Sequence, residues 1–310
     1  MHLARRATAA ALLVAAGCTA SGPGAAGDRA APAPAPTAEV ARFLEGRPLT
    51  GPTGLRLLVA SNPPRLLDVD RGTSRRVDGI PAGQDPFAVS RVGDDALIAG
   101  DRELLVLRRG ATRASPLGRG IRAEASLDGR GGWPPEHGRR RLLRELGLDG
   151  RNREVLGVAG QLVLWGGPEA HAGPFTLTDR RTGARHPVAR PTPHGRAGFG
   201  RTSPDGRLLA VEFADVSWSR VQGQVSDIWL LDLPTRRWRR LPGMPLITPV
   251  KAMSMEWTDD RRLVLVGDFE RFGEAMAVWR PGQQQLAVRR LDLPAYDGSD
   301  SFVAWSAARA

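Results

Sequence analysis

The side chains that could perform acid, base or metal chemistry are few and scattered along this chain. Beyond the N-terminal segment the histidines are His137, His171, His186 and His194, and no pair has the HExxH spacing of a zinc site. No serine lies in a GxSxG turn, and no glycine-rich phosphate loop follows an expected strand. The sequence therefore predicts no metal, no cofactor and no catalytic residue.

Three carboxylates fall in short polar segments between expected strands. Asp205 lies in a Ser-Pro-Asp-Gly segment, and Asp259 and Asp260 lie in a related segment further along the chain. Such segments are typical of tight turns, in which Ser and Asp side chains hydrogen-bond the neighbouring backbone. We therefore expect these carboxylates to shape turns rather than to form an acid/base pair.

The only cysteine, Cys18, ends a short apolar N-terminal segment. The apolar run Thr8 to Ala16 follows two arginines and is shorter than the about 20 residues of a spanning helix, as in a secretory signal. Its Ala-Gly-Cys end resembles the lipobox of bacterial (actinobacterial-type) lipoproteins, although Ala15 stands where that family usually has leucine. The resemblance implies removal of residues 1–17 and lipidation of Cys18. The alternative is an ordinary secretory signal with an incidental cysteine.

Residues 18–50 are predicted to be a flexible tether rich in Ala and Pro. Such a segment cannot bury a core, and it favours extended polyproline geometry of about 3.1 Å per residue. Bacterial lipoproteins carry at least two acyl chains, and two or more chains anchor stably. The expected location is thus the extracytoplasmic side of the cell membrane, with the tether holding a domain away from the lipid.

The chain is strongly basic, with a formal net charge of +11 and a sequence pI near 11.3. Lys251 is the only lysine, so arginine supplies nearly all the positive charge. This charge indicates either an anion-binding surface or a compositional bias toward Arg, Ala, Gly and Pro. Because the arginines are scattered through expected turns, the compositional interpretation is favoured, and nucleic acid is not expected as a partner.

One structural unit recurs along the remaining chain, at intervals of about 40 residues. It consists of an apolar strand, a tight polar turn, and a second strand rich in Arg with Val or Leu. The six copies are Arg65–Val77, Glu103–Leu117, Arg141–Leu156, Pro174–Ala189, Asp227–Leu241 and Ala275–Leu291. This recurrence of short hairpins predicts an all-β domain, a β-propeller over residues 51–310.

Two segments resemble WD40-like and TolB-like repeats. Thr202–Glu212 contains the Ser-Pro-Asp-Gly turn of those repeats, and Trp257–Val266 is a degenerate copy of the same pattern. The resemblance implies that each turn joins the innermost strand of a blade to its second strand. It specifies a fold and leaves the function open.

The two ends of the domain predict how the propeller closes. The first unit begins at Leu55–Ala60 with no strand before it, and the chain finishes with the strand-like Ser301–Trp305. If both strands join one blade, the N- and C-terminal strands close the ring and protect its edges. Six blades are predicted; a seventh would require a blade hidden between Gly183 and Asp227, and a different all-β fold is the remaining alternative.

Two long insertions are the best candidates for a binding surface, because loops on a rigid scaffold concentrate binding function. The candidate residues are Trp218, Arg220, Phe269, Arg271 and Phe272, which would form an aromatic and cationic patch. The competing interpretation is that these loops pack against their neighbours.

The predicted function is a monomeric, membrane-anchored recognition scaffold for an envelope protein, a peptide or a glycan. The alternative is a cell-envelope hydrolase or lyase with its active site at the propeller mouth. Four or more titratable groups that converge at the centre would favour the enzyme, whereas an apolar or arginine-lined funnel would favour binding.

Overall fold

The computed structural model describes residues 46–81, 88–100, 103–117, 142–148, 153–167, 173–193, 195–198, 200–215, 224–248, 253–269, 273–291 and 302–306. The chain divides into two units, Met1–Pro34 and Ala35–Ala310, and all of the described residues belong to the second unit. They form β-strands and one short helical segment at residues 142–145.

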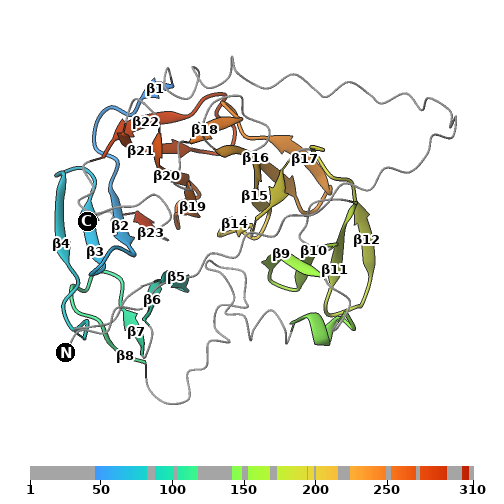
Figure 1. Cartoon of the computed structure of the whole chain (residues 1–310), viewed down its shortest axis with the longest axis horizontal. Coiled ribbons are helices and arrows are strands. Elements are labelled where there is room, and N and C mark those ends of the chain that lie inside the picture. The colour runs from blue at the N-terminus through green and yellow to red at the C-terminus, as the bar shows by residue number, and fades with distance from the viewer. Residues whose placement is uncertain are drawn as a thin grey trace, which may run out of the picture. The chain divides into compact units, whose positions relative to one another are not determined.

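Five β-sheets, here called blades 1 to 5, surround a common centre (Figure 1). Blade 1 contains β23 (Phe302–Ser306), β2 (Leu55–Val59), β3 (Arg65–Asp68) and β4 (Thr73–Arg76). Blade 2 contains β5 (Ala88–Val92), β6 (Asp95–Ala99), β7 (Leu104–Leu107) and β8 (Ser115–Pro116). Blade 3 contains β9 (Glu154–Ala159), β10 (Leu162–Gly166), β11 (Phe175–Asp179) and β12 (Arg185–Val188).

Blades 4 and 5 carry additional short strands. Blade 4 contains β13 (Arg196–Ala197), β14 (Arg201–Thr202), β15 (Leu208–Asp215), β16 (Gln224–Asp232), β17 (Arg237–Arg240) and β18 (Leu246–Thr248). Blade 5 contains β19 (Ser254–Trp257), β20 (Leu263–Phe269), β21 (Gly273–Trp279) and β22 (Ala287–Arg290), with β1 (Arg47–Pro48) parallel to β22 at its outer edge.

The described residues form an all-β β-propeller of five blades. The innermost strands contact one another from blade to blade: β23 contacts β5 and β19, and β14 contacts β9 and β19. The predicted fold class is thus confirmed, but the predicted count of six blades, with seven as the alternative, is wrong.

The error comes from the third predicted hairpin. Leu142–Glu145 is helical, and Leu142 and Leu146 are buried against Val155 and Trp165 of blade 3. Because the helix replaces a strand, the third and fourth predicted repeats together supply a single blade. The interval proposed for a hidden seventh blade instead holds β12 of blade 3 and β13, β14 and β15 of blade 4.

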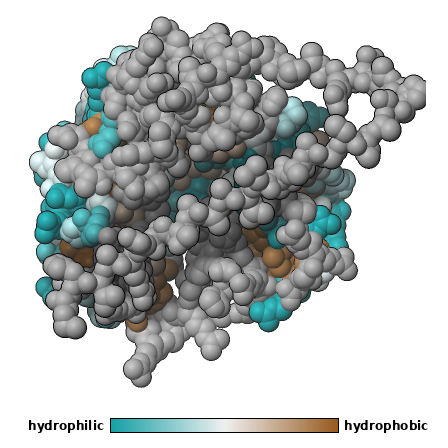
Figure 2. Space-filling view, in the orientation of Figure 1, coloured by the Kyte–Doolittle hydropathy of each residue, from teal (hydrophilic) through white to brown (hydrophobic). Residues whose placement is uncertain are grey.

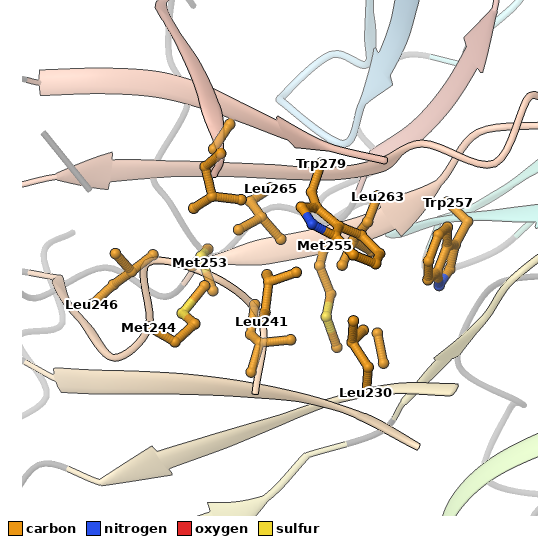
Figure 3. Close-up of a cluster of buried hydrophobic side chains, with 14 of the residues drawn as sticks. Leu230, Leu241, Met244, Leu246, Met253, Met255, Trp257, Leu263, Leu265 and Trp279 are labelled. Atoms are coloured by element: carbon orange, nitrogen blue, oxygen red, sulfur yellow. The ribbon is translucent and has the colours of Figure 1, made fainter. Parts of the chain in front are cut away.

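Hydrophobic clusters fill four junctions between blades: 1 with 2, 3 with 4, 4 with 5, and 5 with 1. Figure 3 shows the cluster between blades 4 and 5, which includes Leu230, Leu246 and Met255 together with two tryptophans. The rings of Trp257 and Trp279 meet edge to face, with centroids 6.3 Å apart and planes at 69°. Both side chains are 1% exposed, so this pair adds specific aromatic geometry to a large buried area.

The Ser-Pro-Asp-Gly segment forms the predicted turn between the innermost strand β14 and the second strand β15. Ser203 donates its hydroxyl to Asp205 over 2.6 Å, and its Oγ accepts the backbone N–H of Leu208 at 2.9 Å. Thr258 and Asp260 repeat the first contact in blade 5, at 2.5 Å. The carboxylates of Asp205 and Asp260 therefore shape turns, as the sequence predicts.

Pairing between β2 and β23 closes the propeller within blade 1. The register runs without interruption from Leu55 opposite Ser306 to Val59 opposite Phe302. The prediction that strands from both ends share one blade is confirmed. From β22 of blade 5, Arg289 donates to the carbonyl oxygens of Leu49 at 3.1 Å and Gly51 at 2.5 Å. These hydrogen bonds fix the segment that leads into β2.

Removal of β23 is expected to abolish cooperative folding. A chain that ends at Ser301 exposes one edge of β2 and loses four core residues, Phe302 to Trp305. Each large buried side chain is worth about 2–5 kcal/mol, against a total stability of about 5–15 kcal/mol. Urea unfolding followed by tryptophan fluorescence tests this, with a chain that ends at Ser306 as the control. A sigmoidal transition with an unchanged midpoint in the shorter chain would contradict it.

Candidate functional site

Most of the residues predicted for a binding patch lie outside the described part of the chain. These are Trp218, Arg220, Arg271 and Phe272. Phe269 is the last residue of β20 and pairs with Gly273 of β21. Cys18 also lies outside the described residues, so its lipidation and the aromatic patch stay predictions.

A cavity of about 180 Å³ lies where the innermost strands of blades 2, 4 and 5 end. Arg91 and Asp94 line it from blade 2, and Glu256 and Asp259 line it from blade 5. Four titratable groups therefore converge near the centre. Four converging titratable groups is the number expected for an enzyme. The hydrogen bonds and ion pairs that each group forms therefore decide whether it is available for catalysis.

Glu256 is nearly fully buried, at 2% exposure. Its Oε1 accepts the backbone N–H of Trp257 at 2.9 Å, and its Oε2 lies 3.5 Å from Nε of Arg201. Burial raises the pKa of the Glu256 carboxyl, while Arg201, Arg91 and the Trp257 N–H act in the opposite direction. Arg91 donates from Nη2 to the carbonyl oxygen of Ala304 in the closing strand.

Asp259 connects three blades. It accepts the N–H and the hydroxyl of Ser306 at 2.8 and 2.6 Å, and Nη2 of Arg109 lies 2.7 Å from its Oδ2. Burial raises the pKa of Asp259, but the Ser306 and Arg109 contacts outweigh burial and hold that pKa below its ordinary value. The central carboxylates thus face guanidinium groups and backbone donors. This arrangement holds blades together and leaves neither carboxylate poised as a free general base.

A larger cavity, about 680 Å³, lies between β2–β4 of blade 1 and the β7–β8 turn of blade 2. We call it the arginine groove. Its floor includes Leu66, Leu107 and Trp305, which belong to one hydrophobic cluster between blades 1 and 2; Leu107 and Trp305 are 1% and 5% exposed, and Leu66 is partly buried. Trp305 is fixed in place because its Nε1 donates to the carbonyl oxygen of Asp94 at 2.9 Å. The volume is in the range of about 300–1,000 Å³ that is typical of ligand pockets.

The strand register explains why cations line this groove. Arg56 lies directly opposite Trp305 and Asp68, and Arg75 lies opposite Leu66. Directly opposed residues in a sheet share a face, so Arg56 and Arg75 continue the face of blade 1 that packs on blade 2. The outer strand of blade 2, β8, is only two residues long, so among the described residues no strand of greater length from blade 2 faces the outer part of that face.

Five arginines and two aspartates line the arginine groove. Arg109 forms an ion pair with Asp259. The Arg71 side chain is exposed, and its Nε lies 4.0 Å from Oδ2 of Asp68. Within the described ranges, Arg56, Arg75 and Arg108 form no ion pair and no side-chain hydrogen bond. In Figure 2 the described surface at the left, over β3 and β4, is mainly hydrophilic with hydrophobic patches between.

The sequence did not point to this groove. The one available signal was an exposed arginine within each of two strands, Arg56 in β2 and Arg75 in β4. In a chain with so many arginines, that signal does not stand out. The sequence also could not show that Trp305, near the end of the chain, forms the floor.

Comparisons with known proteins add little beyond the fold. No family model matches the chain, and no curated protein matches it. Among solved structures, TolB from Acinetobacter baumannii is 11% identical, with a TM-score of 0.35 over 79% of this chain and 54% of that one. The β-propeller domain of the trilobed protease from Pyrococcus furiosus is 23% identical, with a TM-score of 0.30 over 42% of this chain and 38% of that one.

An uncharacterised protein of Listeria monocytogenes is 15% identical, with a TM-score of 0.35 over 47% of this chain and 42% of that one. The chain thus spans about half or less of the length of these three structures. In the part of the chain that the structure describes, no helix is long and apolar enough to cross a membrane. The site must therefore be argued from its own geometry.

Replacement of the buried Glu256 by alanine is expected to lower the free energy of unfolding. Glu256→Ala removes a carboxylate beside the buried Arg201, and breaking a buried pair costs about 3–5 kcal/mol. The matched control is Glu154→Ala, which breaks an ion pair with the half-exposed Arg196 and should cost less than about 1 kcal/mol. Urea unfolding measures both losses. Equal, small losses would show that the central pair does not hold the blades together.

Proposed function

We propose that this protein is a lipid-anchored, extracytoplasmic β-propeller scaffold that binds a ligand in the arginine groove. The observation that carries the proposal is the groove itself: a cavity of about 680 Å³ with a largely buried apolar floor and three arginines at its rim that form no ion pair with a described residue. An apolar cavity with a few polar groups around it is the usual form of a binding site. Its walls are β-strands of two blades, which hold the site in a fixed geometry.

The second candidate function is a hydrolase or lyase at the propeller mouth. The observation in its favour is the convergence of Arg91, Asp94, Glu256 and Asp259 on the central cavity. That cavity measures only about 180 Å³, and both Glu256 and Asp259 already accept hydrogen bonds from the protein. Binding in the groove is therefore the preferred function.

The anchor is argued from the sequence around Cys18 together with the start of the domain. The first described strand, β1, lies at the outer edge of blade 5, where Arg47 pairs with Ala287. β1 is thus part of blade 5, whereas the residues that line the arginine groove belong to blades 1 and 2.

Replacement of the proposed lipid attachment site tests the anchor. Cys18→Ala should move the protein from the membrane fraction to the soluble fraction of cells that express it, because no acyl chain can then be attached. Immunoblots of the two fractions give the distribution for the wild type and the variant. If Cys18→Ala remains with the membrane, the lipoprotein proposal fails.

Photo-crosslinking from the groove tests the scaffold. A photoreactive amino acid at Thr73, the exposed first residue of β4, should give a covalent adduct of defined mass in cells. The same amino acid at Arg237, the exposed first residue of β17 in blade 4, is the matched control and should give none. Identical adducts from both positions, or no adduct from Thr73, would argue against the groove as the binding site.

A further inference from the structure

We propose that the ligand of the arginine groove is an extended acidic segment of a partner protein, with an aliphatic or aromatic side chain between its carboxylates. The inference rests on the proposed function, since it takes the groove to be the binding site. It goes further by assigning the chemistry of the occupant, which follows from the charges of the rim and from the apolar floor.

The rim requires negative charge. Arg56, Arg75 and Arg108 project three guanidinium groups that no described residue neutralises. A guanidinium presents a planar fork of donors that matches the two oxygens of a carboxylate. Three such groups around one cavity repel one another, so an anionic ligand relieves that repulsion as well as forming new hydrogen bonds.

The spacing of these arginines favours an elongated ligand over a single small anion. Arg56 lies on the second strand of blade 1, Arg75 on its outermost strand, and Arg108 at the end of β7 in blade 2. The cations therefore lie on two blades and at different distances from the centre. A ligand that satisfies all three must extend along the groove and carry several anionic groups.

The floor requires an apolar group. Leu66, Leu107 and Trp305 come from three strands and two blades, and together they form the apolar base of the cavity. A central aromatic or aliphatic side chain buried in such a base, with charged contacts around it, is the usual anatomy of a protein–protein hot spot. Anionic polymers such as polyphosphate offer charge but nothing to cover this floor. A peptide that alternates acidic and apolar residues offers both.

The test uses the full-length protein and fluorescent heptapeptides. The probe is Glu-Asp-Glu-Leu-Asp-Glu-Asp, and fluorescence anisotropy measures its Kd at low and at high salt. Two comparison peptides replace either all acidic residues by Gln and Asn, or the central Leu by Gly. Polyphosphate serves as an unlabelled competitor. Weaker binding of the probe at high salt is expected, because added ions screen the arginine–carboxylate attraction.

Two triple variants separate the groove from the general positive charge of the chain. The groove variant carries Arg56→Gln, Arg75→Gln and Arg108→Gln. The control variant loses the same charge at exposed arginines elsewhere: Arg47→Gln, Arg76→Gln and Arg237→Gln. All six side chains are exposed, and equal unfolding midpoints verify that both variants fold. The groove variant should bind the probe at least about tenfold more weakly, which is about 1.4 kcal/mol, and the control variant should bind it like the wild type.

The possible outcomes distinguish the acidic-peptide ligand from the scaffold function on which it rests. Selective loss of binding in the groove variant, with weaker binding of both comparison peptides, supports the inference. Equal loss in both triple variants shows attraction to net charge only and overturns it. Equal affinity for the Leu and Gly probes, with full competition by polyphosphate, identifies an anionic polymer as the occupant and also overturns it. If Thr73 captures a ligand in cells but no acidic peptide binds, the inference fails and the scaffold function stands.

Discussion

The antiparallel pairing of β2 with β23 is the constraint on which the rest of the structure depends. It joins strands separated by nearly the whole domain, with a continuous register from Leu55 opposite Ser306 to Val59 opposite Phe302. Without β23, blade 1 has no innermost strand, and blades 5 and 2 lose their contacts with it. The same strand also supplies Trp305 to the floor of the arginine groove and Ser306 to the bonds around Asp259. Ring closure, the central charges and the groove therefore form together or not at all.

Arginine has two separate uses in this fold. One set is committed to structure: Arg109 binds Asp259 across blades, and Arg289 holds the chain that enters β2. A second set, represented by Arg56 and Arg75, faces a cavity and has no carboxylate partner among the described residues. The sequence suggested that the basic charge reflects composition. In the structure, Arg109 and Arg289 each have a partner within the protein, so the net charge of the chain alone says little about binding. Arg56 and Arg75 are the arginines that favour an anionic ligand.

Several elements were predictable because their signals are local. The Ser203–Gly206 turn is specified by four consecutive residues, and the hairpins of blades 1, 2, 4 and 5 by alternating strands around polar turns. The helix at Leu142–Glu145 was missed because a run of leucines followed by Asp-Gly also fits a strand and a turn. Spacing of Leu142, Leu143 and Leu146 by one and four positions fits a helix face equally well, and burial against blade 3 decides between them. The groove could not be predicted, because it needs the register of β2 against both β3 and β23 and the shortness of β8, none of which is a local property.

The two faces of blade 1 make different contacts. Toward blade 5, the segment before β2 is fixed by Arg289, which binds the carbonyl oxygens of Leu49 and Gly51. The pairing of β1 with β22 fixes the same segment at the outer edge of blade 5. Toward blade 2, a ligand in the arginine groove would contact Trp305 of the closing strand. Because such a ligand binds only the closed propeller, mass action makes occupancy stabilise the β2–β23 pairing. The contacts of Arg289 and the proposed ligand contacts of Trp305 thus lie on the two sides of the same closing blade.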